Sequence, residues 1–143
     1  MRIREVLTAK GSQKVVTVPP SATVAELVAL LAEHNVGALV VSPDGNGVEG
    51  IVSERDVVRR LADMPDILDA RVEQIMTADV HTCSPSDPLD DMMTVMTERR
   101  IRHVPVVDGD ELVGIVSIGD VVKHKIDTLE FERDQLDSYV HRT

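Results

Sequence analysis

The chain of 143 residues is long enough for one compact domain or two very small ones, and its hydrophobic content of 43% suffices for a buried core. A net charge of −10 and an aromatic content of 1% argue against a broad nucleic-acid interface, which needs basic residues and stacking side chains. One Cys, an N-terminus without an apolar signal region and the lack of apolar stretches of about 18 residues favour a cytoplasmic protein without a membrane span.

Residues 1–62 form a first unit, in which the hydrophobic pattern predicts the order β-α-β-β-α. The strands are short and apolar, and a turn rich in Asp and Gly joins the last two into a hairpin. Ser21 or Thr23 caps the first helix, whose Leu and Val residues recur on one face. The expected elements are a strand at residues 15–18, a helix at 22–35, strands at 38–41 and 50–53, and a helix that begins at Asp56.

Residues 71–124 repeat this order as a second unit, and residues 63–70 form the linker. The segment GIVSERDVV at residues 50–58 returns as GIVSIGDVV at residues 114–122, with seven of nine positions identical. Ser86 is expected to cap the first helix. Because neither unit alone can bury its apolar surfaces, we expect the two to pack on each other. The expected elements are a strand at residues 80–83, a helix at 88–100, strands at 104–107 and 114–117, and a helix that begins at Asp120.

The repeated Ser and Asp stand three residues apart, where a strand gives way to a helix. An ionised Asp only accepts hydrogen bonds, so Asp56 and Asp120 suit the two hydroxyl donors of a ribose. Ser53 and Ser117, with the unpaired N–H groups of a helix N-terminus, suit a phosphate. An ordinary helix cap explains one such pair equally well. Its return behind the same Gly-Ile-Val favours a ligand site.

The two copies differ in their basic residues. Arg55 lies inside the first motif and is placed to reach a phosphate, whereas the second motif carries no charge there. Arg102 and His103 precede the second strand of the second unit, where the first unit has no charge. The alternative is a solvated basic end of a helix, which the helix dipole favours. We favour a binding role for Arg102 and His103, and the solvated role for Arg99 and Arg100.

Taken together, these motifs resemble a tandem pair of cystathionine-β-synthase (CBS) domains, also called a Bateman module. The resemblance rests on four features in each half: the lead-in I/V-x-x-I/V-L/M-T, the Pro-Ser turn before a helix, the Asp/Gly hairpin, and G-I-V-S-x-x-D. It covers roughly residues 1–124. It implies an α+β fold of two β-α-β-β-α units packed with pseudo-two-fold symmetry, followed by a C-terminal helix at residues 125–143.

The resemblance also implies a function. Members of the family commonly bind adenosine ligands in the cleft between the units and regulate other proteins without doing chemistry themselves. The ligand expected here is AMP, ADP or ATP, with NAD(H) or S-adenosylmethionine as further candidates, and no obligatory cofactor. In the family, a basic pair at the position of Arg102 and His103 often faces phosphates. The adenine is expected beside backbone near Val15, Thr17 and Val80, and Pro105 completes the expected ligand-binding residues.

Catalytic and metal sites are not expected. The five His residues lack the spacing of a metal site, and no nucleotide-hydrolase or dinucleotide fingerprint is present. Cys83 aligns with Val18, so a buried small apolar side chain is expected there. The alternative function is a structural or partner-binding dimer that has no physiological nucleotide.

The C-terminal segment carries a heptad stripe in which Arg133 takes one of the positions. Either the chain's own units cover this stripe, or a partner does. CBS pairs commonly form homodimers, and we favour dimerisation. The apolar members of the stripe are Val122, Ile126, Leu129, Leu136 and Val140.

Overall fold

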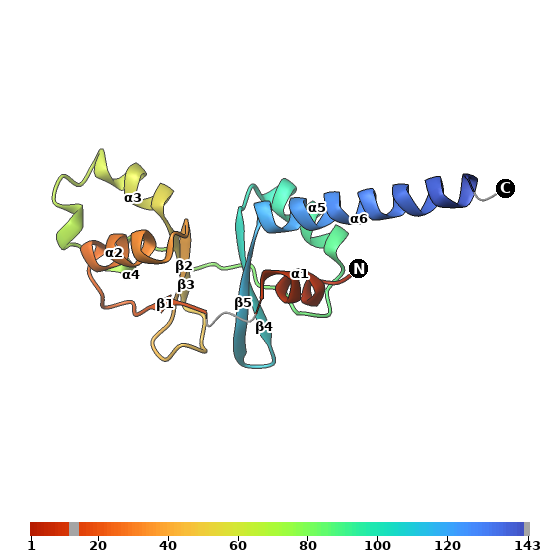
Figure 1. Cartoon of the computed structure of the whole chain (residues 1–143). Helices are drawn as coiled ribbons and strands as arrows, with labels where there is room; N and C mark the ends of the chain where they lie inside the picture. Colours follow the sequence, from red (N-terminus) through yellow and green to blue (C-terminus); the bar gives the residue numbers. More distant parts are fainter. Residues whose placement is uncertain (12–14, 142–143) are drawn as a thin grey trace. The chain divides into compact units, whose positions relative to one another are not determined.

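The structure is a computed structural model that describes residues 1–11 and 15–141 (Figure 1). It is a mixed α+β fold with a long C-terminal helix, which confirms the predicted fold class. Its described residues divide into two compact units. The terminal unit contains residues 1–11, 85–103 and 116–141, and the central unit contains residues 15–84 and 104–115.

The central unit is built around a three-stranded sheet of order β1-β2-β3. β2 pairs with β1 in parallel and with β3 in antiparallel register, so that Val40 lies opposite both Thr17 and Ile51. All four residues of β2 are buried, whereas β3 alternates between buried and half-buried residues. The elements are β1 (Thr17–Val18), α2 (Val24–His34), β2 (Ala38–Val41), β3 (Gly50–Ser53), α3 (Glu54–Leu61), a 3-10 turn η1 (Ile67–Asp69) and α4 (Val72–Ile75).

Local chemistry explains where α2 begins and ends. The hydroxyl of Thr23 accepts a hydrogen bond from the N–H of Glu26 at 3.2 Å, and the Glu26 carboxylate accepts one from the N–H of Thr23 at 3.3 Å. Thr23 is therefore the cap of this helix, and Ser21 is not. Asn35 closes the helix in the left-handed conformation, with a φ of 51°.

The segment expected as a linker contributes to the core of the central unit. Ile67 in η1 is 1% exposed and belongs to the cluster of buried residues that includes Val24, Leu27 and Val52. Gly50, the first residue of the first copy of the repeated motif, lies close to Met76 and Thr77. A Cβ there would come within 2.6 Å of the Met76 sulfur and 2.9 Å of the Thr77 carbonyl oxygen, so this position requires glycine.

The terminal unit combines the first helix of the chain with its last helix. It holds α1 (Ile3–Lys10), α5 (Leu89–Arg99) and α6 (Ile118–Val140), and α6 packs against both other helices. The N–H of Ile3 donates to the carbonyl of Asp87 at 3.0 Å, and the N–H of Leu89 donates to the carbonyl of Met1 at 3.0 Å. Ile3, Val6, Leu89, Met92, Met96 and Val121 are its buried helix residues.

The prediction that Ser86 caps α5 is wrong. The cap position is Pro88, whose side chain makes no capping hydrogen bond. The first N–H of the helix, that of Leu89, is satisfied instead by the carbonyl of Met1 from the other end of the chain.

β4 (His103–Asp108) and β5 (Glu111–Ser117) form a hairpin that turns at Gly109, where φ is 64°. The strand expected at residues 80–83 is not formed in the described chain: one isolated bridge joins Cys83 to Val106. The N–H of Cys83 donates to the carbonyl of Pro105 at 3.0 Å, and the carbonyl of Cys83 accepts from the N–H of Val107 at 2.8 Å. The next bond of a parallel ladder would need an N–H on Pro105, which proline lacks.

The lead-in helices show that the compact units do not follow the sequence repeats. α1 precedes the first repeat but packs in the terminal unit with α5 and α6 of the second. α4 precedes the second repeat but packs in the central unit, where the N–H of Val72 donates to the carbonyl of Ala22 at 2.8 Å. Each repeat therefore completes its core with the lead-in helix of the other.

Candidate functional site

The first candidate site lies at the start of α3 in the central unit. The N–H of Ser53 donates to Oδ2 of Asp56 at 2.8 Å, and the N–H of Asp56 donates to the Ser53 hydroxyl at 3.3 Å. This is a capping box, in which the serine is the cap and the aspartate is the third helical residue. The helix therefore begins at Glu54, two residues earlier than expected, and the N–H of Glu54 donates to the Gly37 carbonyl at 3.0 Å.

The second candidate site lies at the start of α6 in the terminal unit and has the same geometry. The N–H of Ser117 donates to Oδ2 of Asp120 at 3.0 Å, and the N–H of Asp120 donates to the Ser117 hydroxyl at 3.1 Å. α6 begins at Ile118 rather than at Asp120. The N–H of Ile118 donates to the carbonyl of Arg102 at 2.8 Å, so the backbone of Arg102 lies at the start of α6.

Lys10 is a residue of the second site that sequence analysis did not identify. Its ammonium nitrogen lies 2.8 Å from Oδ2 of Asp120, and the two side chains are 35% and 25% exposed. Burial raises the pKa of Asp120, but hydrogen bonds from Lys10 and Ser117 outweigh it, so this pKa lies below its ordinary value of 3.8. In the alignment of the repeats, the position of Lys10 corresponds to Asp79, an acid.

The capping hydrogen bonds use only part of the acceptor capacity of the Asp56 and Asp120 carboxylates. In both sites the capping hydrogen bond goes to Oδ2, whereas an ionised carboxylate offers about four lone-pair sites over its two oxygens. Asp56 and Asp120 are half-buried, so solvent reaches them. The arrangement is thus able to hold a helix end and accept hydroxyl donors at the same time.

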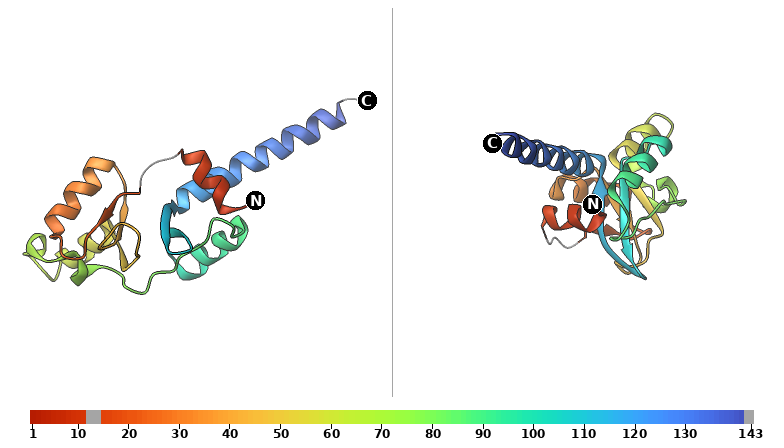
Figure 2. Two further views of the ribbon diagram at one scale, coloured as in Figure 1. Left: turned by 90° about the horizontal axis from the view of Figure 1, so that it is seen from below. Right: turned by 90° about the vertical axis from the view of Figure 1, so that its right-hand side faces the viewer.

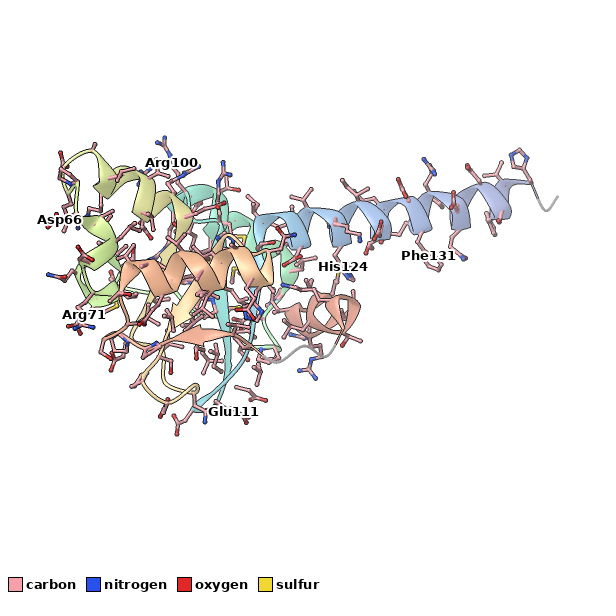
Figure 3. The ribbon with its side chains drawn as sticks, turned by 60° about the vertical axis from the view of Figure 1, so that its left-hand side comes forward. Asp66, Arg71, Arg100, Glu111, His124 and Phe131 are labelled. Atoms are coloured by element: carbon pink, nitrogen blue, oxygen red, sulfur yellow. The ribbon has the colours of Figure 1, made fainter. Side chains whose placement is uncertain are left out.

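The other predicted site residues lie in both units. Arg55 is exposed on α3, and Val15, Thr17 and Val80 are half-buried in the central unit. His103 is half-buried at the start of β4, whereas Pro105 is buried and uses its carbonyl for Cys83. Figure 3 shows that Arg100, for which a solvated role was expected, projects from the surface.

A shallow hollow of about 470 Å³ lies on the central unit, between the end of α2 and the start of α3. Its lining is mainly apolar and includes Val28, Leu31, Val57 and Val58, with Glu54 as a charged member. Neither Ser53 nor Asp56 lines it. The hollow is therefore an apolar surface feature beside the first site and does not contain its serine and aspartate.

Cys83 is buried, as expected for a small apolar position. Across residues 1–11 and 15–141, no three His, Cys, Asp or Glu side chains gather in a way that would hold a metal ion. None of the helices in the described part of the chain combines the length and apolar character that crossing a membrane requires.

Comparison with known proteins identifies the family. The profile of the CBS domain matches residues 3–63 and 72–127, one match for each repeat. The chain belongs to the CBS domain family. A curated relative, a 33.4 kDa protein in a ribosomal RNA operon of Thermofilum pendens, is 46% identical over 99 residues. Those residues are 69% of this chain but 32% of the relative, so this chain spans about a third of its length.

Solved structures of CBS domain proteins are similar to this chain over most of its length. The CBS-domain containing protein ATU1752 from Agrobacterium tumefaciens is 39% identical with a TM-score of 0.82, covering 87% of this chain and 99% of that one. The protein PAE2072 from Pyrobaculum aerophilum, complexed with AMP, is 33% identical with a TM-score of 0.74, covering 84% and 89%. The CBS domain pair of protein MJ0100, in complex with 5-methylthioadenosine and S-adenosyl-L-methionine, is 26% identical with a TM-score of 0.79, covering 90% and 98%.

Proposed function

We propose that this CBS pair is a regulatory module without catalytic activity, which binds an adenosine-containing ligand through its serine–aspartate sites. The observation that carries the proposal is the recurrence of one geometry at the starts of α3 and α6, with carboxylates that retain acceptor capacity. Similar CBS proteins were solved with AMP, and with 5-methylthioadenosine and S-adenosyl-L-methionine, which supports an adenosine ligand.

In this proposal each side chain has a chemical role. The carboxylates of Asp56 and Asp120 accept hydrogen bonds from the two ribose hydroxyls. Ser53 and Ser117 stand at helix N-termini, where the partial positive charge favours a phosphate. Backbone near Val15, Thr17 and Val80, together with Pro105, is proposed to contact the adenine.

The two sites have different cations. At Asp120 the ammonium of Lys10 lies 2.8 Å from the carboxylate, and the backbone of Arg102 is bonded to the first residue of α6. With His103 next in the chain, these residues favour a phosphorylated ligand such as AMP, ADP or ATP at this site. At Asp56 the cation supplied by the motif is the exposed Arg55. NAD(H) and S-adenosylmethionine are the other adenosine ligands to compare.

A bound ligand transmits a signal only if it binds one conformation better than another. We propose that this chain works as a homodimer in the cytoplasm, and that binding changes its conformation or its dimer geometry for an unidentified regulated protein to read. Turnover of ATP or NADH by the purified protein would contradict the non-catalytic part of this proposal.

A second candidate function is a structural dimer that binds no nucleotide. The observation that favours it is that each serine and aspartate already completes a capping box, a stabilising role that needs no ligand. The two functions differ in what the second carboxylate oxygen does, and a conservative substitution separates them.

The test is isothermal titration of nucleotide-free protein with AMP, ATP, S-adenosylmethionine and NADH. The variants are Asp56→Asn and Asp120→Asn, which keep an acceptor for the cap but lose the charge. Each is expected to weaken binding at one site at least tenfold, or about 1.4 kcal/mol. Glu26→Gln is the matched control, because it makes the same change in the capping box of α2. If all variants bind like the parent, the ribose assignment is wrong, and if the parent binds nothing, the structural dimer is favoured.

A further inference from the structure

The side chains of the outer half of α6, residues 129–140, are all exposed in the described part of the chain. Among the residues of α6, all of which the structure describes, Val121 alone is buried, and every residue from Leu129 onward is exposed. Figure 2 shows this helix continuing well past α1 and α5 of the same unit. Most of the stability of a helix in a protein comes from packing of an apolar face, so a partner that covers this segment would stabilise it.

The exposed face of α6 carries a coiled-coil pattern. Its apolar residues are separated by 4, 3, 7 and 4 positions, and Arg133 fills the one polar place in the stripe. In heptad terms, Ile126, Arg133 and Val140 take position a, and Val122, Leu129 and Leu136 take position d. The exposed fractions are 42% for Val122, 49% for Ile126, 51% for Leu129, 65% for Leu136 and 64% for Val140.

We propose that a second copy of this chain covers the stripe, with its own α6 running antiparallel. The position of Arg133 in the stripe indicates that the two helices run antiparallel. In a parallel pair the a positions meet each other, so two Arg133 guanidinium groups would share the seam. In an antiparallel pair a faces d, so Arg133 faces Leu129 of the second copy and lies near the acidic Glu130 and Glu132.

One register satisfies every position of the stripe. Alignment of Arg133 with Leu129 also aligns Ile126 with Leu136 and Val122 with Val140, and the reverse holds because the pair is symmetric. The contact then runs over about 28 Å of helix.

The charges along α6 agree with this direction. Its first part, residues 118–128, carries two lysines, Lys123 and Lys125, and two aspartates, whereas its outer half carries four acids and one arginine. The antiparallel register places both lysines near Asp137 of the second copy, although Lys125 also bonds Asp90 of its own chain at 3.1 Å. At the centre of this register Glu130 lies level with Glu132 of the second copy, and the two Arg133 side chains offset these charges. A parallel pair would stack the two acidic halves along their whole length. The same acidic half makes an anionic lipid surface an unfavourable partner.

This inference names a surface for the self-association proposed above, but it does not depend on nucleotide binding. The test is the mass of the full-length protein by light scattering without ligand, for the parent, Leu136→Glu and Phe131→Glu. The two variants are matched, because Leu136 is 65% and Phe131 is 64% exposed, and Figure 3 shows Phe131 projecting from α6. Phe131 lies at position f, away from the stripe.

We expect the mass of Leu136→Glu to fall to half that of the parent, and the mass of Phe131→Glu to stay at the parent value. A monomeric parent, an unchanged mass for Leu136→Glu, or an equal fall for Phe131→Glu would each overturn the proposal. Circular dichroism checks that both variants fold. A failed nucleotide titration would leave this result unaffected, since the mass is measured without ligand.

The direction of the helices is tested by disulfide cross-linking of Ile126→Cys and Leu136→Cys proteins. The antiparallel pair predicts a covalent dimer when the two are mixed and oxidised, and little from either protein alone. Cys83 is buried and common to both samples. Efficient cross-linking of Leu136→Cys alone would show parallel helices.

Discussion

The contact between Lys10 and Asp120 allows a quantitative test of the second site. Lys10→Met removes the ammonium and keeps most of the aliphatic chain. The nitrogen and oxygen are 2.8 Å apart, and the side chains are 35% and 25% exposed, so solvent still screens the pair. Exposed ion pairs contribute about 0.2 to 1 kcal/mol. Because this pair is partly buried and hydrogen-bonded, we expect a loss of about 1 kcal/mol, or about 3 °C in Tm.

The assay is urea unfolding at pH 7 of Lys10→Met, Asp120→Asn and the double variant. If the two side chains interact directly, Lys10→Met should lower the free energy of unfolding only slightly in the Asp120→Asn background. The double-mutant cycle then gives the coupling energy between the two side chains. Lys125→Met is the comparison, because its partner Asp90 is 74% exposed, and its cost should be below about 0.5 kcal/mol. Equal losses for Lys10→Met in both backgrounds would refute the direct interaction.

The pH dependence of the same pair gives a second check. The pKa of Asp120 is lowered in the folded protein, so the folded state holds this proton less tightly than the unfolded chain, whose ordinary value is 3.8. The stabilisation is therefore present above about pH 5 and decreases as the pH falls through 3.8 and below. The difference between parent and Lys10→Met should shrink over that range, and a difference that stays constant to pH 2 would contradict this assignment.

Two further predictions concern the fold, and both are measured by urea unfolding. Ile67→Ala should cost about 2 to 5 kcal/mol because Ile67 is 1% exposed in the core, whereas its neighbour Leu68, 51% exposed, should tolerate alanine at little cost. Equal effects would mean that residues 63–70 act as a simple linker. Thr23→Ala should cost about 1 kcal/mol through the lost cap, whereas Ser21→Ala should cost less than half of that. A larger effect of Ser21→Ala than of Thr23→Ala would show that Ser21 caps α2 instead.

Much of the candidate site could be predicted because its interactions are local. A serine cap and an aspartate three residues later meet across one helical turn, so their contact depends on a few consecutive residues. The hairpin before each pair has the same local origin in its Asp and Gly turn. The exact first residue of α3 and α6 was missed by two residues, since the predicted start was placed on the aspartate rather than on the serine cap.

Other predictions failed where distant chain segments decide the outcome. Ser86 was a reasonable local cap, but the carbonyl of Met1 satisfies the first N–H of α5. The strand at residues 80–83 looked like its counterpart in the first repeat, but its partner strand contains Pro105, which cannot donate the next hydrogen bond. In both cases the deciding group lies far away in the sequence.

The sequence by itself determined the repeat, the α+β class, the family and the two serine–aspartate pairs, because each is encoded within a short window of residues. Only the tertiary structure decided that each lead-in helix packs with the other repeat. That exchange brings Lys10 to Asp120 and makes the second site electrostatically different from the first. It also decided that α1 and α5 cover only the first part of α6, because a stripe of apolar residues does not show which segments lie against it.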